Sequence, residues 1–305
     1  MGSGSPPFAG RRYRRLADEI RREFGERLYK VTIDAGMTCP VRDGRLGAGG
    51  CAFCGPEGSG PGRDSALSIE EQIRIRRRGR PGRFIAYLQA FTNTYCAPET
   101  LDSILERLSA EAGVAAIAIG TRPDCVPEET LRVIARWAQL RKIWMEYGLQ
   151  SVHLRTLLAI RRGHTPADFS DACTRTRAHG LEVVAHVILG LPGETREDMN
   201  ETARALTAHR VNGVKIHMLN IVRGSKMAEA YERGEIELLT CEQYVGAVCD
   251  FLERLDESIT IHRLTGEHPP WELIAPEWVL DKSRVLRMID EELIRRDSWQ
   301  GRLAL

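Results

Sequence analysis

Long apolar runs, a hydrophobic N-terminus and an excess of charge of either sign are all missing from this chain of 305 residues. No stretch approaches the roughly 20 apolar residues that a membrane-spanning helix needs, and no N-terminal region resembles a signal peptide. The 43 Lys and Arg residues nearly balance the 42 Asp and Glu residues, so the chain lacks the overall basic charge typical of nucleic-acid-binding domains. We therefore predict a cytoplasmic protein with no membrane partner.

Internal repeats and low-complexity linkers are also missing, which favours one domain. With 43% hydrophobic residues the chain can bury a sizeable core. Residues 1–10 are expected to be a flexible leader. The remainder, 11–305, is expected to form a single domain, with its core at about 24–265 and a helical C-terminal cap over 266–305.

Lysine is scarce and most of the basic residues are arginines, of which twelve lie in two segments, 11–22 and 74–83. A solvated helix face and a patch that binds an RNA backbone explain these clusters equally well. In the second interpretation, a helix over 11–24 packs its apolar side on the core. Arg11, Arg15 and Arg22 then face the solvent and contact RNA.

Three of the eight cysteines lie close together in a glycine-rich segment, at Cys39, Cys51 and Cys54. Three thiolates suit a soft metal centre. Because structural zinc sites and conventional clusters take four protein ligands, three ligands leave one metal position open for catalysis. The alternative is a zinc knuckle completed by a distant Cys or His. The other cysteines are expected to be mostly small buried hydrophobes in a reducing compartment: Cys96, Cys125, Cys173, Cys241 and Cys249.

Apolar runs typical of strands alternate with helical patterns along most of the chain. Strands are expected at 30–36, 83–91, 114–120, 142–148, 181–190 and 213–220, with a last strand at 258–264. Helix starts with capping-box spacing are expected at Ser68, Thr165, Thr195 and Thr240. Six β/α units with Val- and Ile-rich strands predict an α/β fold with a parallel sheet, curled into a partial (β/α)6 TIM-like barrel.

Polar side chains gather where these strands end, and the chemistry of such barrels lies at those ends. Each position also has a purely structural interpretation, as a turn cap or an ion pair, and His164 is expected to cap a helix start. Lys215 and His217 are two residues apart on one predicted strand and therefore share a face. They contact the substrate if that face points inward. The other candidates are Gln89, Thr92, Arg122, Glu146, Gln150 and Arg162.

The cysteine loop follows the first strand, closes with Cys51-Ala-Phe53-Cys54, and resembles the cluster loop of the radical S-adenosylmethionine (radical SAM) superfamily. Eleven residues separate Cys39 from Cys51, whereas three is usual. A long first spacing is similar to the Elongator-catalytic-subunit-like branch and its YhcC-type bacterial subfamily. The segments Thr121-Arg-Pro-Asp124 and Glu146-Tyr-Gly-Leu-Gln150-Ser151 also resemble that branch.

The resemblance implies that the three cysteines hold a [4Fe–4S] cluster whose open iron binds S-adenosylmethionine. One electron then cleaves the cofactor to a 5′-deoxyadenosyl radical, and a reductase or a flavodoxin- or ferredoxin-type protein donates that electron. Cofactor contacts are implied for the adenine (Phe53, Gly190), the amino group (Gln89, Thr92), the ribose and carboxylate (Gln150, Arg162), and further for Arg122 and Glu146. The resemblance also favours inward-facing, catalytic Lys215 and His217.

Relatives in that branch act on the wobble uridine of tRNA, so the resemblance implies a tRNA partner. Two alternatives remain open. One is a radical SAM enzyme that acts on a small metabolite or a protein. The other, of a different class, is a zinc-dependent RNA-binding module without catalysis.

Overall fold

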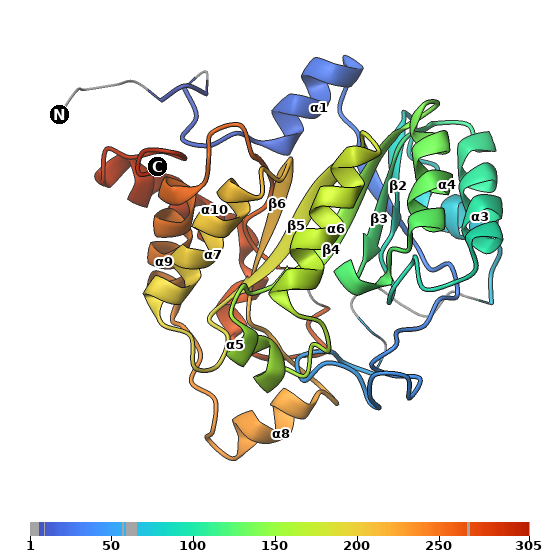
Figure 1. Cartoon of the computed structure of the whole chain (residues 1–305). Coiled ribbons are helices and arrows are strands. Elements are labelled where there is room, and N and C mark those ends of the chain that lie inside the picture. The colour runs from blue at the N-terminus through green and yellow to red at the C-terminus, as the bar shows by residue number, and fades with distance from the viewer. Residues whose placement is uncertain (1–5, 9, 57, 59–65, 267–268, 305) are drawn as a thin grey trace.

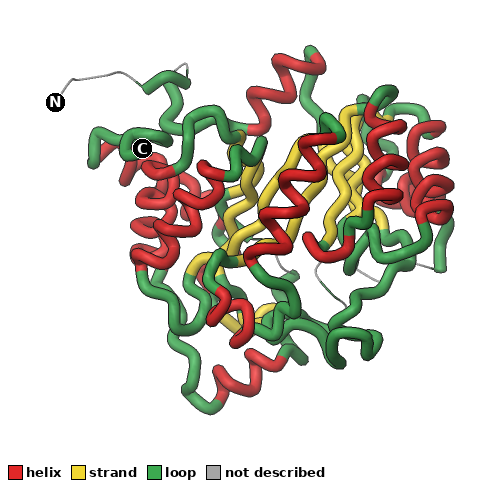
Figure 2. The backbone as a smooth tube through the Cα atoms, viewed as in Figure 1, coloured by secondary structure: helices red, strands yellow, loops and turns green. Residues whose placement is uncertain are grey.

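The computed structural model describes residues 6–8, 10–56, 58, 66–266 and 269–304, and its centre is one curled parallel sheet (Figures 1 and 2). Seven strands pair in the order β1-β2-β3-β4-β5-β6-β8. Their bounds are β1 Tyr29–Ile33, β2 Phe84–Leu88, β3 Val114–Thr121, β4 Lys142–Gln150, β5 Glu182–Leu189, β6 Gly213–Met218 and β8 Thr260–Arg263. The predicted partial barrel is confirmed, and the strand expected at 258–264 makes it seven-stranded.

Helices cover the outer face of the sheet, which explains why its strands are apolar on both faces. Every residue of β3 is buried, for example, as expected for a parallel strand with helices on one side and the barrel interior on the other. The helices are α1 Leu16–Phe24, α2 Ile69–Arg77, α3 Pro98–Ala110, α4 Glu128–Ala138, α5 Leu154–Ala159, α6 Pro166–Ala178, α7 Arg196–Ala208, α8 Lys226–Glu232, α9 Cys241–Arg254 and α10 Lys282–Arg295.

The four predicted helix starts are confirmed as capping boxes. Ser68, Thr165, Thr195 and Thr240 each accept a hydrogen bond from the backbone three residues later, and that later side chain bonds back. Such caps satisfy backbone N–H groups that have no partner within the helix.

Two predicted boundaries are wrong. The first helix begins at Leu16, because the chain just before it pairs with the edge of the sheet: the Arg14 carbonyl accepts from the Ile261 N–H, and Arg15 forms a parallel bridge with Ile261. The C-terminal cap is not wholly helical. Its strand β9 (Leu273–Ala275) pairs antiparallel with β7 (Ile221–Val222). The predicted leader lies largely outside the described residues.

Helix α1 closes the barrel at the N-terminal ends of the strands, opposite the cysteine loop (Figure 1). Its Ile20 belongs to an apolar cluster with Ile85, Trp144 and Val184 inside the sheet. From this apolar layer toward the C-terminal ends of the strands, the interior of the barrel becomes polar, and the candidate site lies there.

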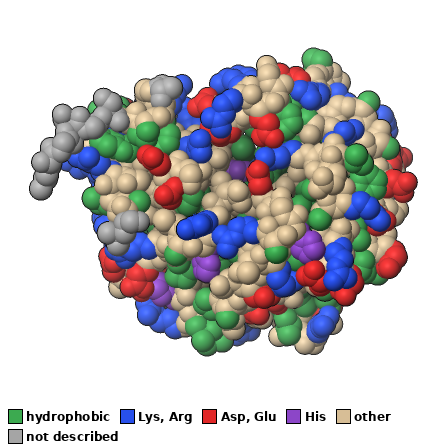
Figure 3. All heavy atoms as spheres, turned by 45° about the horizontal axis from the view of Figure 1, so that its top comes forward, with side chains coloured by type: hydrophobic (Ala, Val, Ile, Leu, Met, Phe, Trp, Pro, Cys, Tyr) green, Lys and Arg blue, Asp and Glu red, His purple; other side chains and the backbone are tan. Residues whose placement is uncertain are grey.

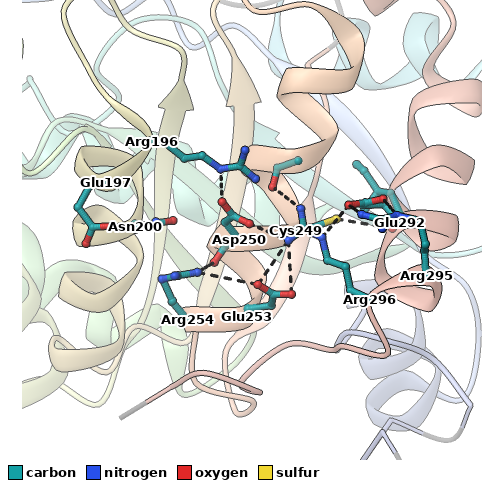
Figure 4. Close-up of polar contacts among 12 residues, drawn as sticks. Arg196, Glu197, Asn200, Cys249, Asp250, Glu253, Arg254, Glu292, Arg295 and Arg296 are labelled. Carbon is teal, nitrogen blue, oxygen red and sulfur yellow. Dashed lines mark hydrogen bonds and ion pairs between the residues drawn. The ribbon is translucent and has the colours of Figure 1, made fainter.

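Ion pairs join the C-terminal helix α10 to α9 and α7 (Figure 4). Arg296, just after α10, donates to Asp250 and to Glu292 at 2.7 Å each. Asp250 also pairs with Arg196 of α7. None of the helices among the described residues combines the length and apolar composition needed to cross a membrane.

Candidate functional site

The cysteine loop lies across the C-terminal ends of the strands and is held there by backbone hydrogen bonds. The Gly50 N–H donates to the Val41 carbonyl at 2.9 Å, which folds the loop back on itself. Ala52, between the second and third cysteines, donates to Ile160 at 2.9 Å and accepts from Met227 at 3.0 Å. The loop is therefore tied to the end of α5 on one side and to α8 on the other.

A cavity of about 610 Å³ opens beside this loop and brings the candidate residues together. Twelve of the thirteen predicted site residues line it, including all three cysteines of the loop. Gly190 is the exception. It has a φ of +80°, and a Cβ there would lie 3.0 Å from Leu239 Cδ1, so this glycine lies against a side chain outside the cavity.

Gly148 in β4 allows a guanidinium group to approach the cysteines. Arg162 donates from Nε and Nη2 to the Gly148 carbonyl, at 3.1 and 2.8 Å, and its Nη1 lies 3.4 Å from the Cys51 sulfur. A Cβ on residue 148 would lie 2.5 Å from Arg162 Nη2 and 2.8 Å from Gln150 Nε2. Gln150 has a φ of +74° at a bulge in the pairing with β5. Glycine at 148 thus makes room for two of the predicted cofactor contacts.

Arg122 is buried in an ion pair. It donates to both carboxylate oxygens of Asp124, at 2.9 and 2.8 Å, and to the Arg162 carbonyl at 2.6 Å. The Arg122–Asp124 ion pair is present, and Arg122 also lines the cavity, so the pair fits both a structural role and a guanidinium oriented toward a ligand.

The predicted capping role of His164 is wrong, because Thr165 is the helix cap. The His164 ring is buried instead and bonds through Nε2 to the Gly148 carbonyl at 3.0 Å. Burial, with the nearby Arg162 and Arg122 charges, lowers the pKa of His164 to about 3.

Deeper in the cavity, one carboxylate holds two basic side chains. Glu146 accepts from Lys215 and from His186 Nε2, the latter at 2.9 Å. Although burial opposes ionisation, the Lys215 charge and the His186 bond hold the pKa of Glu146 well below its usual value. Burial lowers the pKa of Lys215 well below that of an exposed lysine, and lowers that of His186 to about 4. Lys215 therefore gives up a proton more readily than a surface lysine does.

This layer carries more positive than negative charge. Lys30 and Arg263 line the cavity together with Lys215, whereas Glu146 is the carboxylate among them. Lys215 Nζ also lies 4.1 Å from the centre of the Tyr87 ring. A water-poor layer with this balance attracts an anionic group.

Sequence reasoning missed Lys30, Tyr87, His186 and Arg263 in this layer. A signal was present for Tyr87, which lies two residues before the predicted site residue Gln89 in the strand expected at 83–91. Among the scattered cysteines, Cys125, Cys173, Cys241 and Cys249 are buried as predicted and Cys96 is half-buried.

The arrangement of the thiols fits a cluster better than a single zinc ion. Tetrahedral zinc brings its sulfur ligands within about 4 Å of one another. Among the described residues, the ligand atoms of His153, Asp198 and Glu201 are the one group of three or more within 4.8 Å, so the cysteine loop does not gather its sulfurs that tightly. A cluster binds each thiolate to a different iron and needs a wider spacing. Thr92 Oγ1, which is buried beside the cavity without a hydrogen-bond partner among the described residues, fits a polar ligand.

Comparisons with known proteins agree with this chemistry. Residues 44–206 match the sequence model of the Radical SAM superfamily, and residues 211–295 match that of the Radical_SAM C-terminal domain. YtqA of Bacillus subtilis is 39% identical over 298 residues, which cover 96% of this chain and 92% of that protein. Protein YhcC of Escherichia coli is 34% identical over 263 residues, which cover 85% of each chain.

More distant similarities extend to proteins with informative names. A tRNA uridine(34) acetyltransferase of Methanocaldococcus jannaschii is 28% identical over 130 residues, which cover 42% of this chain and 24% of that protein. The solved structure of Elp3 from Methanocaldococcus infernus superposes with a TM-score of 0.67 and 16% identity. The superposition covers 90% of this chain and 64% of that chain, so the two share a fold.

The two family models together match more than half of the sequence, and YtqA is similar along nearly all of it. The chain belongs to the radical SAM superfamily, in agreement with the predicted Elongator-like branch, and is an enzyme whose cofactors are a [4Fe–4S] cluster and S-adenosylmethionine.

Proposed function

We propose that this enzyme modifies a tRNA at its wobble uridine, in the cytoplasm, with electrons from a reductase or a flavodoxin- or ferredoxin-type protein. The tRNA part is supported by the relative named a tRNA uridine(34) acetyltransferase and by the fold shared with Elp3. The single observation that carries the chemistry is the convergence of the three loop cysteines and nine other candidate residues on one cavity.

Cys39, Cys51 and Cys54 are the residues that would hold the cluster. When bound, the cluster and S-adenosylmethionine together supply a 5′-deoxyadenosyl radical that removes a hydrogen atom from the substrate. The backbone bonds of Ala52 on both sides of the loop keep the thiols in place. Arg162, 3.4 Å from Cys51, balances the negative charge that three thiolates bring to a buried site.

The cavity wall provides contacts for each part of S-adenosylmethionine. The Arg162 guanidinium suits the carboxylate, and the Gln150 amide suits the ribose hydroxyls. Gln89 and the unpartnered Thr92 hydroxyl suit the amino group. Phe53 lines the cavity where an adenine ring would pack.

Three further residues have less direct roles. Arg122 acts on the cofactor through Arg162, because its guanidinium is already bound to Asp124 and to the Arg162 carbonyl. Glu146 likewise positions Lys215. Gly190, outside the cavity, ends β5, whose backbone we assign to the adenine.

Lys215 and His217 face into the cavity below the cysteine loop, where the reacting part of the substrate would lie. Lys215 is held by Glu146 and has a lowered pKa, so its Nζ is suited to deliver a proton or to bind an anionic group. His217, two residues further along β6, lines the same wall.

Alanine substitution of the cysteines tests the cluster assignment. Replacing Cys39, Cys51 or Cys54 should abolish iron retention and 5′-deoxyadenosine formation, because two thiolates hold a cluster poorly. Cys173→Ala and Cys249→Ala are the matched controls, since both side chains are buried in the apolar core. Anaerobic iron and sulfide analysis is the measurement, and equal iron loss in all five variants would contradict the assignment.

Mass spectrometry of tRNA nucleosides from a deletion strain tests the substrate. We expect one modified uridine from the wobble position to disappear or to be replaced by its precursor. An unchanged nucleoside profile would remove the tRNA proposal and favour a small anionic metabolite, which the cationic layer also fits. One zinc ion per chain without iron would instead identify a non-catalytic binding module.

A further inference from the structure

The rim of the cavity carries an exposed tryptophan that the chemistry above does not use. Trp271 is 74% exposed, more than any other large hydrophobic side chain among the described residues. It lies in the turn that leads into β9, next to Glu272, and Glu272 and Pro269 of the same turn line the cavity. A single exposed hydrophobic side chain is ordinary by itself, so the significance of Trp271 depends on where it lies and on the groups around it.

Pairing between β7 and β9 holds this turn at the mouth. The Arg223 N–H donates to the Glu272 carbonyl at 2.8 Å, and Arg223 Nε donates to the Trp271 carbonyl at 3.2 Å. On the other side, the segment that contains Arg223 contacts the cysteine loop, since a Cβ on Gly55 would lie 3.7 Å from the Arg223 carbonyl. Arg223 therefore connects Trp271 to the loop that would hold the cluster, because it contacts both.

Four arginines lie at this mouth or in the segments next to it. Arg42 donates to the Gly55 and Pro56 carbonyls, and Arg45 has Asp43 as an acidic neighbour. Arg42 and Arg223 line the cavity, Arg45 lies exposed in the cysteine loop, and Arg161 lies exposed beside Arg162. Within the part of the chain that the structure describes, none of the four forms an ion pair with a carboxylate. Glu272 is the one carboxylate among the described residues 269–272 of the Trp271 turn.

The opposite end of the barrel differs in this respect. In the N-terminal segment Arg12, Arg14, Arg21 and Arg22 are each paired with a carboxylate. Figure 3, turned to bring this end forward, shows basic and acidic side chains interspersed around a hollow with a histidine at its floor. Among the described residues, Arg11 and Arg15 of this segment form no such pair, and Arg14 and Arg22 share Glu19. Most of the charges at this end therefore have an acidic partner nearby, whereas Arg223 and Arg42 at the mouth form no ion pair with a described carboxylate.

An exposed aromatic ring among unpaired guanidinium groups is the chemistry that binds single-stranded RNA, with bases stacked on the ring and phosphates held by arginine. A protein partner would more commonly meet an apolar patch with a polar rim than a lone ring among cations. We propose that Trp271 stacks on a nucleobase next to the one that enters the cavity, while Arg223 and the other unpaired arginines of the mouth hold the flanking phosphates. This inference rests on the proposed tRNA function and deepens it.

Binding of an anticodon stem–loop RNA with uridine at the wobble position, measured by fluorescence anisotropy on the intact holoenzyme, tests the proposal. Trp271→Ala should weaken binding about tenfold, because one stacked base is lost. Trp271→Phe should retain most of the affinity, and Trp271→Leu should not. Leu140→Ala is the matched control, since Leu140 is 63% exposed but precedes β4 at the other end of the barrel.

A second pair of variants tests the phosphate contacts. Arg223→Gln should weaken binding and lower the slope of log affinity against log salt by about one, whereas Arg22→Gln should change neither. Iron content and melting temperature of each variant report whether it folds.

Wild-type affinity in both Trp271→Ala and Trp271→Leu overturns the stacking proposal and leaves the tRNA function standing. Full affinity in Trp271→Leu alone identifies an apolar contact and overturns it as well. If the wild-type enzyme binds the stem–loop no better than a blunt RNA duplex of equal length, the tRNA function fails and this inference fails with it.

Discussion

At the scale of single residues, Gly148 determines how closely two polar side chains approach the cysteine loop. Its carbonyl accepts from Arg162 and from His164, and its missing Cβ leaves room for Arg162 Nη2 and Gln150 Nε2. A methyl group at this position would occupy the space where the guanidinium now lies. We therefore expect Gly148 to affect ligand binding through the positions of Arg162 and Gln150.

Gly148→Ala should lower the affinity for S-adenosylmethionine while the iron content stays unchanged. Displacing Arg162 removes a charge-assisted hydrogen bond worth about 1.5–3 kcal/mol, so the dissociation constant should rise at least tenfold in a calorimetric titration. Gly55→Ala is the matched control, because its Cβ would meet Val222 Cγ2 at an ordinary 3.5 Å. Equal affinity in both variants would show that Arg162 is not a cofactor contact.

The buried histidines make stability depend on pH. The pKa of His186 is about 4, below the roughly 6.5 of an unfolded histidine. Between these values the unfolded chain takes up a proton that the folded chain refuses, so acid favours unfolding, by up to about 1.4 kcal/mol per pH unit for each such group. His164, with a pKa of about 3, acts in the same direction.

We expect the melting temperature to fall as the pH decreases from about 6.5 to about 4. His186→Gln should reduce that fall, because glutamine still donates a hydrogen bond to Glu146 but cannot take up a proton. Differential scanning calorimetry at several pH values is the measurement. A parallel decline in wild type and variant would mean that His186 does not titrate as its burial implies.

At the scale of elements, the sequence predicts what depends on local pattern. The sheet strands are apolar runs between turn and capping residues, so all seven are predictable, including β8. Strands β7 and β9 are two and three residues long and leave no periodicity to detect. The first helix was predicted too long because Arg11–Arg15 continue the charge pattern of the helix while the backbone at Arg14 and Arg15 pairs with the sheet edge.

The same distinction between local pattern and contacts of distant residues applies to the site. Cysteine spacing, strand-end positions and the resemblance to the radical SAM superfamily together predict twelve residues that the fold brings to one cavity. The partners of Glu146 are separated from it by 40 and 69 residues. Predicting that His186 and Lys215 pair with Glu146 requires the strand register, which sequence pattern alone does not supply. The roles assigned to these residues in cofactor binding and catalysis remain predictions.

The ion-pair network of α7, α9 and α10 makes a prediction about stability alone (Figure 4). Arg296→Met keeps the apolar stem of the side chain and removes its bonds to Asp250 and Glu292. The carboxylates left behind are partly solvated, so we expect a loss of about 2 kcal/mol in unfolding free energy. Thermal melting measures this loss. A matching loss of S-adenosylmethionine affinity would contradict the view that the network only secures the C-terminal helix.

At the scale of the whole molecule, the N-terminal arginines and the cysteine loop lie at opposite ends of the barrel. From the sequence, two interpretations of Arg11, Arg15 and Arg22 are equally good: a solvated helix face and an RNA-binding patch. Helix α1 carries Arg22, and together with the segment before it lies at the N-terminal ends of the strands, across the barrel from the cysteine loop (Figure 1). The structure therefore favours the solvated face.

Changing Arg11, Arg15 and Arg22 together to Gln should leave the affinity for anticodon stem–loop RNA and its salt dependence unchanged. Changing Arg45, Arg161 and Arg223 to Gln should weaken binding and flatten the salt slope, because fewer phosphates are neutralised. Filter binding across a salt series measures both. A larger effect from the N-terminal triple variant would mean that the RNA binds the opposite end of the barrel.

The apolar layer around Ile20 has a kinetic consequence. Because the apolar cluster around Ile20 occupies the other end of the barrel and the proposed cofactor contacts line the cavity beside the cysteine loop, the cofactor and the proposed RNA share the mouth of that cavity. An RNA bound across that mouth would prevent small molecules from entering or leaving the cavity. Turnover is then ordered: S-adenosylmethionine enters first and RNA second, and the spent cofactor fragments leave only after the RNA has departed.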